Sequence, residues 1–99
     1  MILLYTTFPN EKVAREICSQ LVNKDLVKCV NIINNGFSIY KWEGKFAEEP
    51  EVYAYLKTTA EKFAETEDFI KKNHPYTTPC LLEIKLNHIS PEYKEWVES

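Results

Sequence analysis

The segment 73–80 concentrates side chains that can do chemistry. It carries the imidazole of His74, the phenol of Tyr76 and the thiol of Cys80, and imidazole and thiolate are ligands that suit copper or zinc. Its two prolines restrict the backbone and favour an extended residue before each, so we expect a stiff loop between a helix and a strand. The plainer alternative is that the His-Pro pair only ends the helix, with Tyr76 packed over its last turn.

Most other motifs of catalysis or cofactor binding are absent. Two glycines are too few for the usual phosphate-binding loop, and no serine lies in a Gly-x-Ser-x-Gly motif. We interpret the carboxylates Glu48, Glu49 and Glu51 as a solvated rim rather than an acid–base pair. A second imidazole, His88, is present, but the histidines and the three cysteines match no standard zinc spacing.

Composition limits the class of protein. The 99 residues predict a single domain, 1–99, and a hydrophobic content of 44% with 27% charged residues is typical of a soluble globular protein. A formal net charge of −3 argues against nucleic acid as a partner. No apolar run approaches the roughly 18 residues that a membrane span needs. An odd number of cysteines without a Cys-x-x-Cys motif favours a reduced, cytoplasmic location.

The first half of the chain predicts a strand, a helix and a long hairpin. Residues 2–6 form an apolar run typical of a buried strand. A helix follows Asn10, which can cap it, because apolar residues recur every four positions from Val13 to Leu21. The stretch 27–58 is rich in β-branched and aromatic residues, and Gly44 marks the turn of a hairpin.

The second half predicts a helix, a strand and a short terminal helix. Thr58 and Glu61 have the spacing of a capping box, and the apolar side chains that follow predict a core face of Ala60, Phe63, Ala64 and Ile70. Alternation of Leu82, Ile84 and Leu86 with charged residues predicts a half-buried strand. Ser90 and Pro91 begin a helix with an apolar stripe of Tyr93, Trp96 and Val97. The resulting order is that of an α+β, ferredoxin-like split βαβ fold, with both long helices on one face of an antiparallel sheet.

The hairpin is too long for one small domain. A strand over 29–42 would reach about 45 Å, whereas a sphere of this mass is only about 34 Å across. Gly36 and Glu51 should face each other where the hairpin bends. The distal arm is apolar, so we expect another copy of the chain to pair with it and bury it. The alternative is that the arm folds back over the open face of its own sheet. The apolar side chains of the arm are Phe37, Ile39, Tyr40, Trp42 and Phe46.

Six segments, which together span the chain in order, resemble the CutA family of divalent-cation tolerance proteins. They are Thr6-Thr7-x-Pro9-Asn10-Glu11, Lys28-Cys29-Val30-Asn31-Ile32-Ile33, Ser38-Ile39-Tyr40-Lys41-Trp42-Glu43-Gly44-Lys45, Lys57-Thr58-Thr59-Ala60-Glu61-Lys62, His74-Pro75-Tyr76-x-x-Pro79 and Tyr93-x-x-Trp96. The resemblance implies a ferredoxin-like protomer in a homotrimer, with strands paired across subunits by the long hairpin. It also implies tolerance of copper and other divalent cations, and it brings no catalytic reaction, so we expect a protein that is not an enzyme and requires no cofactor.

The resemblance extends to the PII signalling proteins, which bind small effectors in clefts between subunits. We therefore expect an inter-subunit cleft here. Lys57 would offer a charge to an anionic ligand, Tyr40 and Trp42 would form flat walls, and His74 would contact a proton or a metal. The full set of expected cleft residues is Asn31, Tyr40, Trp42, Lys57, Thr58, His74 and Tyr76.

At two positions the sequence differs from some copper-binding relatives. Those relatives can carry cysteine where Thr6 stands and a second histidine where Asn73 stands, and Cys80 replaces a common glutamate. We therefore predict only modest binding of copper or another divalent cation, with His74 as the anchoring ligand and Cys80 as a further soft ligand. The alternatives are a PII-like sensor of a small anion and a trimeric scaffold that docks a partner protein.

Overall fold

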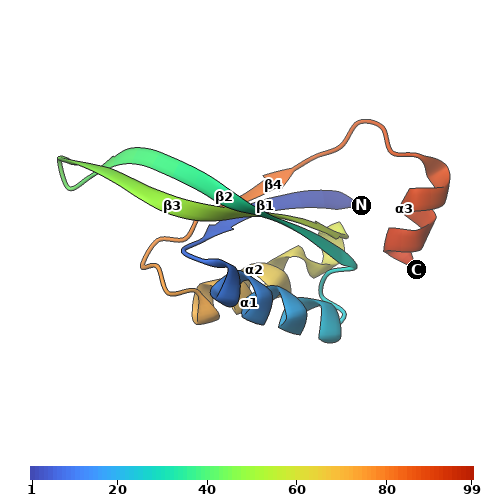
Figure 1. The fold of residues 1–99 in the computed structure, drawn as a ribbon. Helices are drawn as coiled ribbons and strands as arrows, with labels where there is room; N and C mark the ends of the chain where they lie inside the picture. Colours follow the sequence, from blue (N-terminus) through green and yellow to red (C-terminus); the bar gives the residue numbers. More distant parts are fainter.

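The structure, a computed structural model that describes residues 1–99, is built on a four-stranded antiparallel sheet (Figure 1). The sheet order is β2-β3-β1-β4, and each neighbouring pair is antiparallel. The predicted α+β, split βαβ order is therefore confirmed. None of the helices has the length and apolarity needed to cross a membrane. The elements are β1 (Ile2–Phe8), α1 (Glu11–Asn23), β2 (Cys29–Trp42), β3 (Lys45–Thr58), α2 (Phe63–Asn73), β4 (Leu81–Ile84) and α3 (Pro91–Glu98).

The core lies between one face of the sheet and the helices α1 and α2, which cover that face side by side (Figure 1). Alternate residues of β1 and β3 are buried toward the helices, as the period of a strand requires. The helix α1 begins as predicted, because the side chain of Asn10 accepts a hydrogen bond from the backbone N–H of Val13 at 2.9 Å. The apolar core side chains are Ile2, Leu4, Phe8, Ala14, Ile17, Cys18, Leu21, Leu26, Val27, Val52, Ala54, Leu56 and Ile70.

The predicted capping box at the start of the second helix is wrong. Thr58 is the last residue of β3, and its buried hydroxyl donates to the carbonyl oxygen of Leu26 at 2.6 Å. A 3₁₀ turn over Ala60–Lys62 precedes α2 and has no side-chain cap. Because this turn has about three residues per turn, it shifts the phase of the helix that follows.

The core face of α2 therefore differs from the predicted one. Ala60 and Ala64 are exposed, whereas Thr66 is buried beside Ile70. In β4 the phase also differs, because Leu81 packs against the core while Leu82 and Ile84 are exposed. A shift of one residue moves every side chain of a strand to the other face. The open face of the sheet is consequently more apolar than expected.

The β2–β3 hairpin extends well beyond the core (Figure 1). Gly36 pairs with Glu51 as predicted, next to a bulge between Ile33 and Gly36. The molecule is 45 Å long, against 26 and 23 Å in the other directions. The five apolar side chains of the arm are between 40% and 66% exposed. In a single chain, the alternative that the arm folds back over its own sheet is wrong.

Candidate functional site

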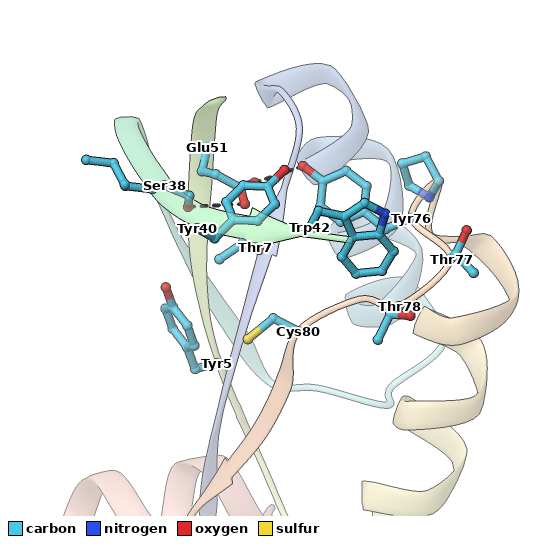
Figure 2. A pocket seen from close by; sticks show the side chains of 12 residues that line it. Tyr5, Thr7, Ser38, Tyr40, Trp42, Glu51, Tyr76, Thr77, Thr78 and Cys80 are labelled. Atoms are coloured by element: carbon cyan, nitrogen blue, oxygen red, sulfur yellow. Dashed lines mark hydrogen bonds between the residues drawn. The ribbon is translucent and has the colours of Figure 1, made fainter. Parts of the chain in front are cut away.

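A cavity of about 670 Å³ lies where the arm leaves the core, beside the connection from α2 to β4 (Figure 2). Four parts of the chain contribute to its wall: β1, β2, β3 and the connection itself. The lining residues are Tyr5, Thr7, Ser38, Ile39, Tyr40, Trp42, Glu51, Pro75, Tyr76, Thr77, Thr78 and Cys80.

Strand periodicity determines which side chains reach this cavity. In β1, Leu4 and Phe8 are buried toward the helices, so Tyr5 and Thr7 belong to the opposite face. In β2, Ser38, Tyr40 and Trp42 are two residues apart and share one face by the same rule. The arm therefore presents its polar and aromatic face to the connection after α2, at the end of the open face of the sheet.

His74 holds the connection after α2 in place. It has extended backbone geometry, as expected before a proline, and it ends the helix. Its ring is buried, with Nε2 2.7 Å from the carbonyl oxygen of Thr7 and Nδ1 accepting the backbone N–H of Tyr76 at 3.1 Å. It also stacks on Phe8, with 5.1 Å between ring centroids. Both ring nitrogens are thus already used within the fold.

Glu51 is the charged centre of the cavity. Its carboxylate accepts a hydrogen bond from the hydroxyl of Tyr76 at 2.9 Å and another from the hydroxyl of Ser38 at 3.2 Å (Figure 2). Burial first, and then the hydrogen bond to Glu51, raises the pKa of Tyr76. The phenol therefore stays protonated and keeps donating to the carboxylate.

The electrostatic environment of the cavity is negative. Burial and the charge of Glu51 raise the pKa of the Cys80 thiol. Burial, followed by the charges of Glu49 and Glu51, raises the pKa of Tyr40. No lysine, arginine or histidine lines the cavity, so nothing in its wall offsets these carboxylates.

Only part of the expected cleft comes together in one chain. Tyr40, Trp42 and Tyr76 line the cavity with Cys80, and the ring of His74 lies against Tyr76 at 4.7 Å between centroids. The other three expected residues, Asn31, Lys57 and Thr58, are not in its wall.

Those three residues lie elsewhere on the sheet. The ammonium of Lys57 donates to the side-chain oxygen of Asn31 and lies 3.9 Å from the sulfur of Cys29. The hydroxyl of Thr58 is buried on the helix side of the sheet. Within one chain, Lys57 therefore does not reach a ligand in the cavity.

Sequence reasoning misses Glu51, Tyr5 and Ser38 as lining residues. It assigns Glu51 to a solvated rim, although the predicted pairing with Gly36 already places this residue at the bend of the hairpin. The hydrogen bond from Tyr76 to Glu51 joins residues that are 25 positions apart, so only the folded chain brings them together.

The donor atoms present do not form a metal centre within one chain. No group of three or more His, Cys, Asp or Glu side chains is close enough to hold a metal ion. Cys80 and Glu51 reach the cavity, but His74 is engaged by two backbone groups. The hydroxyl of Thr6 donates to the carbonyl oxygen of Cys80 at 2.7 Å, and Asn73 donates to Phe69 at 2.8 Å. The side chains of Thr6 and Asn73 are therefore used structurally.

Comparison with known proteins identifies a family whose members are similar to this chain over nearly its whole length. The family model described as CutA1 divalent ion tolerance protein matches residues 2–99. The divalent-cation tolerance protein CutA of Thermotoga maritima is 40% identical over 99 residues, which cover 98% of this chain and 95% of that protein.

Solved structures agree over nearly the whole chain. The divalent cation tolerance protein Cut A1 from Thermus thermophilus matches with a TM-score of 0.94 and 35% identity, covering 98% of this chain and 94% of that one. A structure described as the periplasmic divalent cation tolerance protein CutA from Archaeoglobus fulgidus matches with a TM-score of 0.93 and 38% identity, covering 97% and 93%. The chain described here therefore belongs to the CutA family of divalent-cation tolerance proteins.

Proposed function

We propose that this protein acts in divalent-cation tolerance as a non-enzymatic homotrimer, and that the cavity beside the hairpin arm is its ligand-binding cleft. The observation that carries the proposal is the exposed apolar arm. The exposed apolar side chains lie on both faces of this arm, and so much exposed apolar surface on a small protein marks an interaction site. Family membership favours three copies, with the arm pairing strands across subunits.

The open edges of the sheet support self-association. The strands β2 and β4 are at the two edges, and each leaves backbone N–H and C=O groups without a strand partner. The exposed side chains of Leu82 and Ile84 on β4 add apolar surface next to one of these edges. Pairing with a neighbouring copy satisfies the edges and buries both apolar regions in a single step.

We further propose that the cavity binds a divalent cation directly. Copper is preferred over zinc by nitrogen and sulfur ligands, and Cys80 and Glu51 are the donors that reach the cavity. His74 would join them only by giving up the hydrogen bond to Thr7 or the one from Tyr76. We therefore expect modest affinity, with further donors supplied by a neighbouring copy.

A sensor of small anions is the second candidate. One observation favours it, because Lys57 forms no ion pair and is held only by Asn31 and Cys29. An anion would then bind at this lysine rather than in the cavity. Calorimetry with phosphate on the wild type and on Lys57→Met distinguishes these two sites. The variant should lose phosphate binding if the anion binds at Lys57 and should keep it if the anion binds in the cavity.

The assembly is tested by light scattering at low micromolar concentration. We expect a mass near three times 11.6 kDa. A folded species of 11.6 kDa under these conditions would refute the proposal. Circular dichroism on the same samples reports whether the chain is folded.

The cytoplasm is the location we propose for this protein. All three cysteines are free, which suits a reducing compartment. The Archaeoglobus structure is described as periplasmic, so the location is open to a direct test. Fractionation of the host cell should recover the protein with cytoplasmic markers, and recovery with periplasmic markers would contradict the proposal.

A further inference from the structure

We propose that side-chain contacts on both faces of the sheet fix the bend of the β2–β3 hairpin, so that each chain sets the direction of its own arm before subunits associate. The inference rests on the proposed function, because the direction of the arm matters to an assembly that the arm joins. It adds the positioning residues, which are Glu51 and Tyr76 on the open face and Glu11 and Asn34 on the helix face.

The bend lies where the hairpin leaves the core. The regular pairing of β2 with β3 shifts between Ile33 and Gly36, and Asn35 has a positive φ of 66°. A bulge of this kind leaves residues unpaired and bends the strand. Beyond it, the paired strands continue away from α1 and α2 (Figure 1). The direction of the arm therefore depends on the contacts that hold these few residues.

On the open face, the connection after α2 holds the bend through Tyr76. Its hydroxyl donates to the carboxylate of Glu51 on β3 at 2.9 Å, and the hydroxyl of Ser38 on β2 donates to the same carboxylate at 3.2 Å (Figure 2). Glu51 thus joins both strands of the hairpin to the connection. The connection is itself fixed, because the ring of His74 bonds the backbone of Tyr76 and the carbonyl oxygen of Thr7.

On the helix face, the start of α1 holds the same bend through Asn34. The side-chain amide of Asn34, which lies inside the bulge, donates to the carboxylate of Glu11 at 2.6 Å. Glu11 is held in turn, because it also accepts a hydrogen bond from Arg15 one turn further along the helix. Hydrogen bonds to an ionised carboxylate are about twice as strong as neutral ones. Each face therefore contributes one such bond to the bend.

Tyr53 fastens the first residue of the arm between these two contacts. Its hydroxyl exchanges hydrogen bonds with the backbone N–H and C=O of Phe37 at 2.9 and 3.1 Å. This bond replaces part of the ladder that the bulge disrupts. All of these contacts join residues of one chain, so none of them requires the arm to be exposed.

A fixed arm lowers the cost of association. A segment that is free to move must be ordered when it binds, and this ordering opposes binding. Differences in affinity among variants of one interface are mostly differences in dissociation rate, so a subunit with a loose arm should leave the trimer faster. The alternative is that neighbouring copies alone orient the arm, in which case the loss of these contacts changes nothing.

Subunit exchange measures the effect on the assembly. Isotope-labelled and unlabelled protein are mixed, and native mass spectrometry follows the appearance of mixed trimers. Tyr76→Phe removes only the hydroxyl that bonds Glu51, and it should accelerate exchange about tenfold. Glu16→Gln removes a charge from an exposed position of α1 and should exchange at the wild-type rate. Circular dichroism confirms that each variant is folded.

Double variants show whether the residues act through these contacts. Glu51→Met removes the acceptor but keeps the length of the side chain. If Tyr76 acts through Glu51, adding Tyr76→Phe to Glu51→Met should accelerate exchange no further. Adding Asn34→Ala to Tyr76→Phe should accelerate it again, because the contact of Asn34 with Glu11 is a separate one on the other face.

Residual dipolar couplings report the direction of the arm in any assembly state. In the wild type, the backbone couplings of residues 37–42 and those of β1 should fit one alignment frame. In the Asn34→Ala/Tyr76→Phe variant, the couplings of the arm should shrink while those of β1 persist. This result would show a loosened bend in an otherwise intact fold.

Two results would overturn the inference and leave the proposed trimer intact. The first is wild-type exchange and wild-type couplings in Asn34→Ala/Tyr76→Phe. The second is further acceleration by Tyr76→Phe in the Glu51→Met background, because Tyr76 would then act by another route. A monomeric wild-type protein would refute the proposed assembly instead. In that monomer, reduced arm couplings in the double variant would support the inference, and unchanged couplings would overturn it.

Discussion

The Nε2 atom of His74 lies 2.7 Å from the carbonyl oxygen of Thr7, and this bond fastens the connection after α2 to the central strand β1. The other ring nitrogen accepts the backbone N–H of Tyr76. The imidazole therefore positions Tyr76, whose hydroxyl in turn reaches Glu51. Removing the ring should disturb both the fold and the cavity.

His74→Ala should lower the free energy of unfolding by about 2–3 kcal/mol, because it leaves the buried carbonyl of Thr7 without its partner. Urea unfolding at a fixed protomer concentration measures this change. His88→Ala is the control, since His88 is exposed and its loss should cost less than about 0.5 kcal/mol. Equal midpoints for the two variants would show that the bond to Thr7 contributes nothing.

Calorimetry with metal ions tests the role of His74 as a ligand. Cu(II) should bind more tightly than Zn(II). The affinity for Cu(II) should still be modest, because the imidazole must first release a backbone partner. The His74→Ala variant should lose this binding while His88→Ala retains it. If His74→Ala titrates like the wild type, the metal is bound by Cys80, His88 or an adventitious site.

Gly36→Ala should destabilise the hairpin. A Cβ atom at this position would lie 2.3 Å from the Cζ of Tyr53 and 2.7 Å from the carbonyl oxygen of Glu51, so the strands must move apart. Overpacking of this kind costs about 1–3 kcal/mol. Tyr53 is not free to move, because its hydroxyl exchanges hydrogen bonds with the backbone of Phe37 at 2.9 and 3.1 Å.

Gly44→Asn is the matched control for Gly36→Ala. A Cβ atom at Gly44 meets nothing within 4 Å, and asparagine tolerates its positive φ of 79° better than other residues. Urea unfolding should show a clearly lower midpoint for Gly36→Ala than for Gly44→Asn. The reverse order would mean that turn geometry, not the contact with Tyr53, limits this hairpin.

The buried thiol of Cys18 should make stability fall at alkaline pH. Burial raises its pKa from 9.0 to about 12. The unfolded chain therefore loses this proton first, so the stabilisation is complete below pH 9 and is lost as the pH rises toward 12. The unfolding free energy of Cys18→Ala should decline less steeply over this range than that of the wild type. Parallel plots of unfolding free energy against pH for the two proteins would show that the Cys18 thiol does not cause this loss of stability.

Trp42→Asp tests the arm as an interface. In a trimer that buries the arm, the new carboxylate would be unpaired and would cost several kcal/mol, so light scattering should show dissociation or unfolding. Ser19→Asp adds the same charge at an exposed position of α1 and should leave the mass unchanged. An intact trimer in Trp42→Asp would place the subunit interface elsewhere.

Local patterns in the sequence determined the elements of this protein and the register of its hairpin. The cap at Asn10 and the pairing of Gly36 with Glu51 both follow from short-range residue preferences, and both are observed. The ion pairs Glu67–Lys71 and Asp68–Lys72 have the i,i+4 spacing at which opposite charges meet on a helix. Such features depend on neighbours along the chain, which a sequence displays directly.

The tertiary structure alone decided which faces meet and which polar groups remain available. Strand periodicity places Leu81 and Leu82 on opposite faces of β4, but packing against the helices determined that Leu81 is the residue that faces the core. In the same way, the side chain of Thr58 lies on the buried face of β3, and a ring nitrogen of His74 is bonded to the carbonyl of Thr7, which is distant in the sequence. Glu51 became the centre of a cavity because a hydroxyl 25 residues away reached it. Contacts between distant segments leave no local pattern, so the site emerges only when the chain has folded.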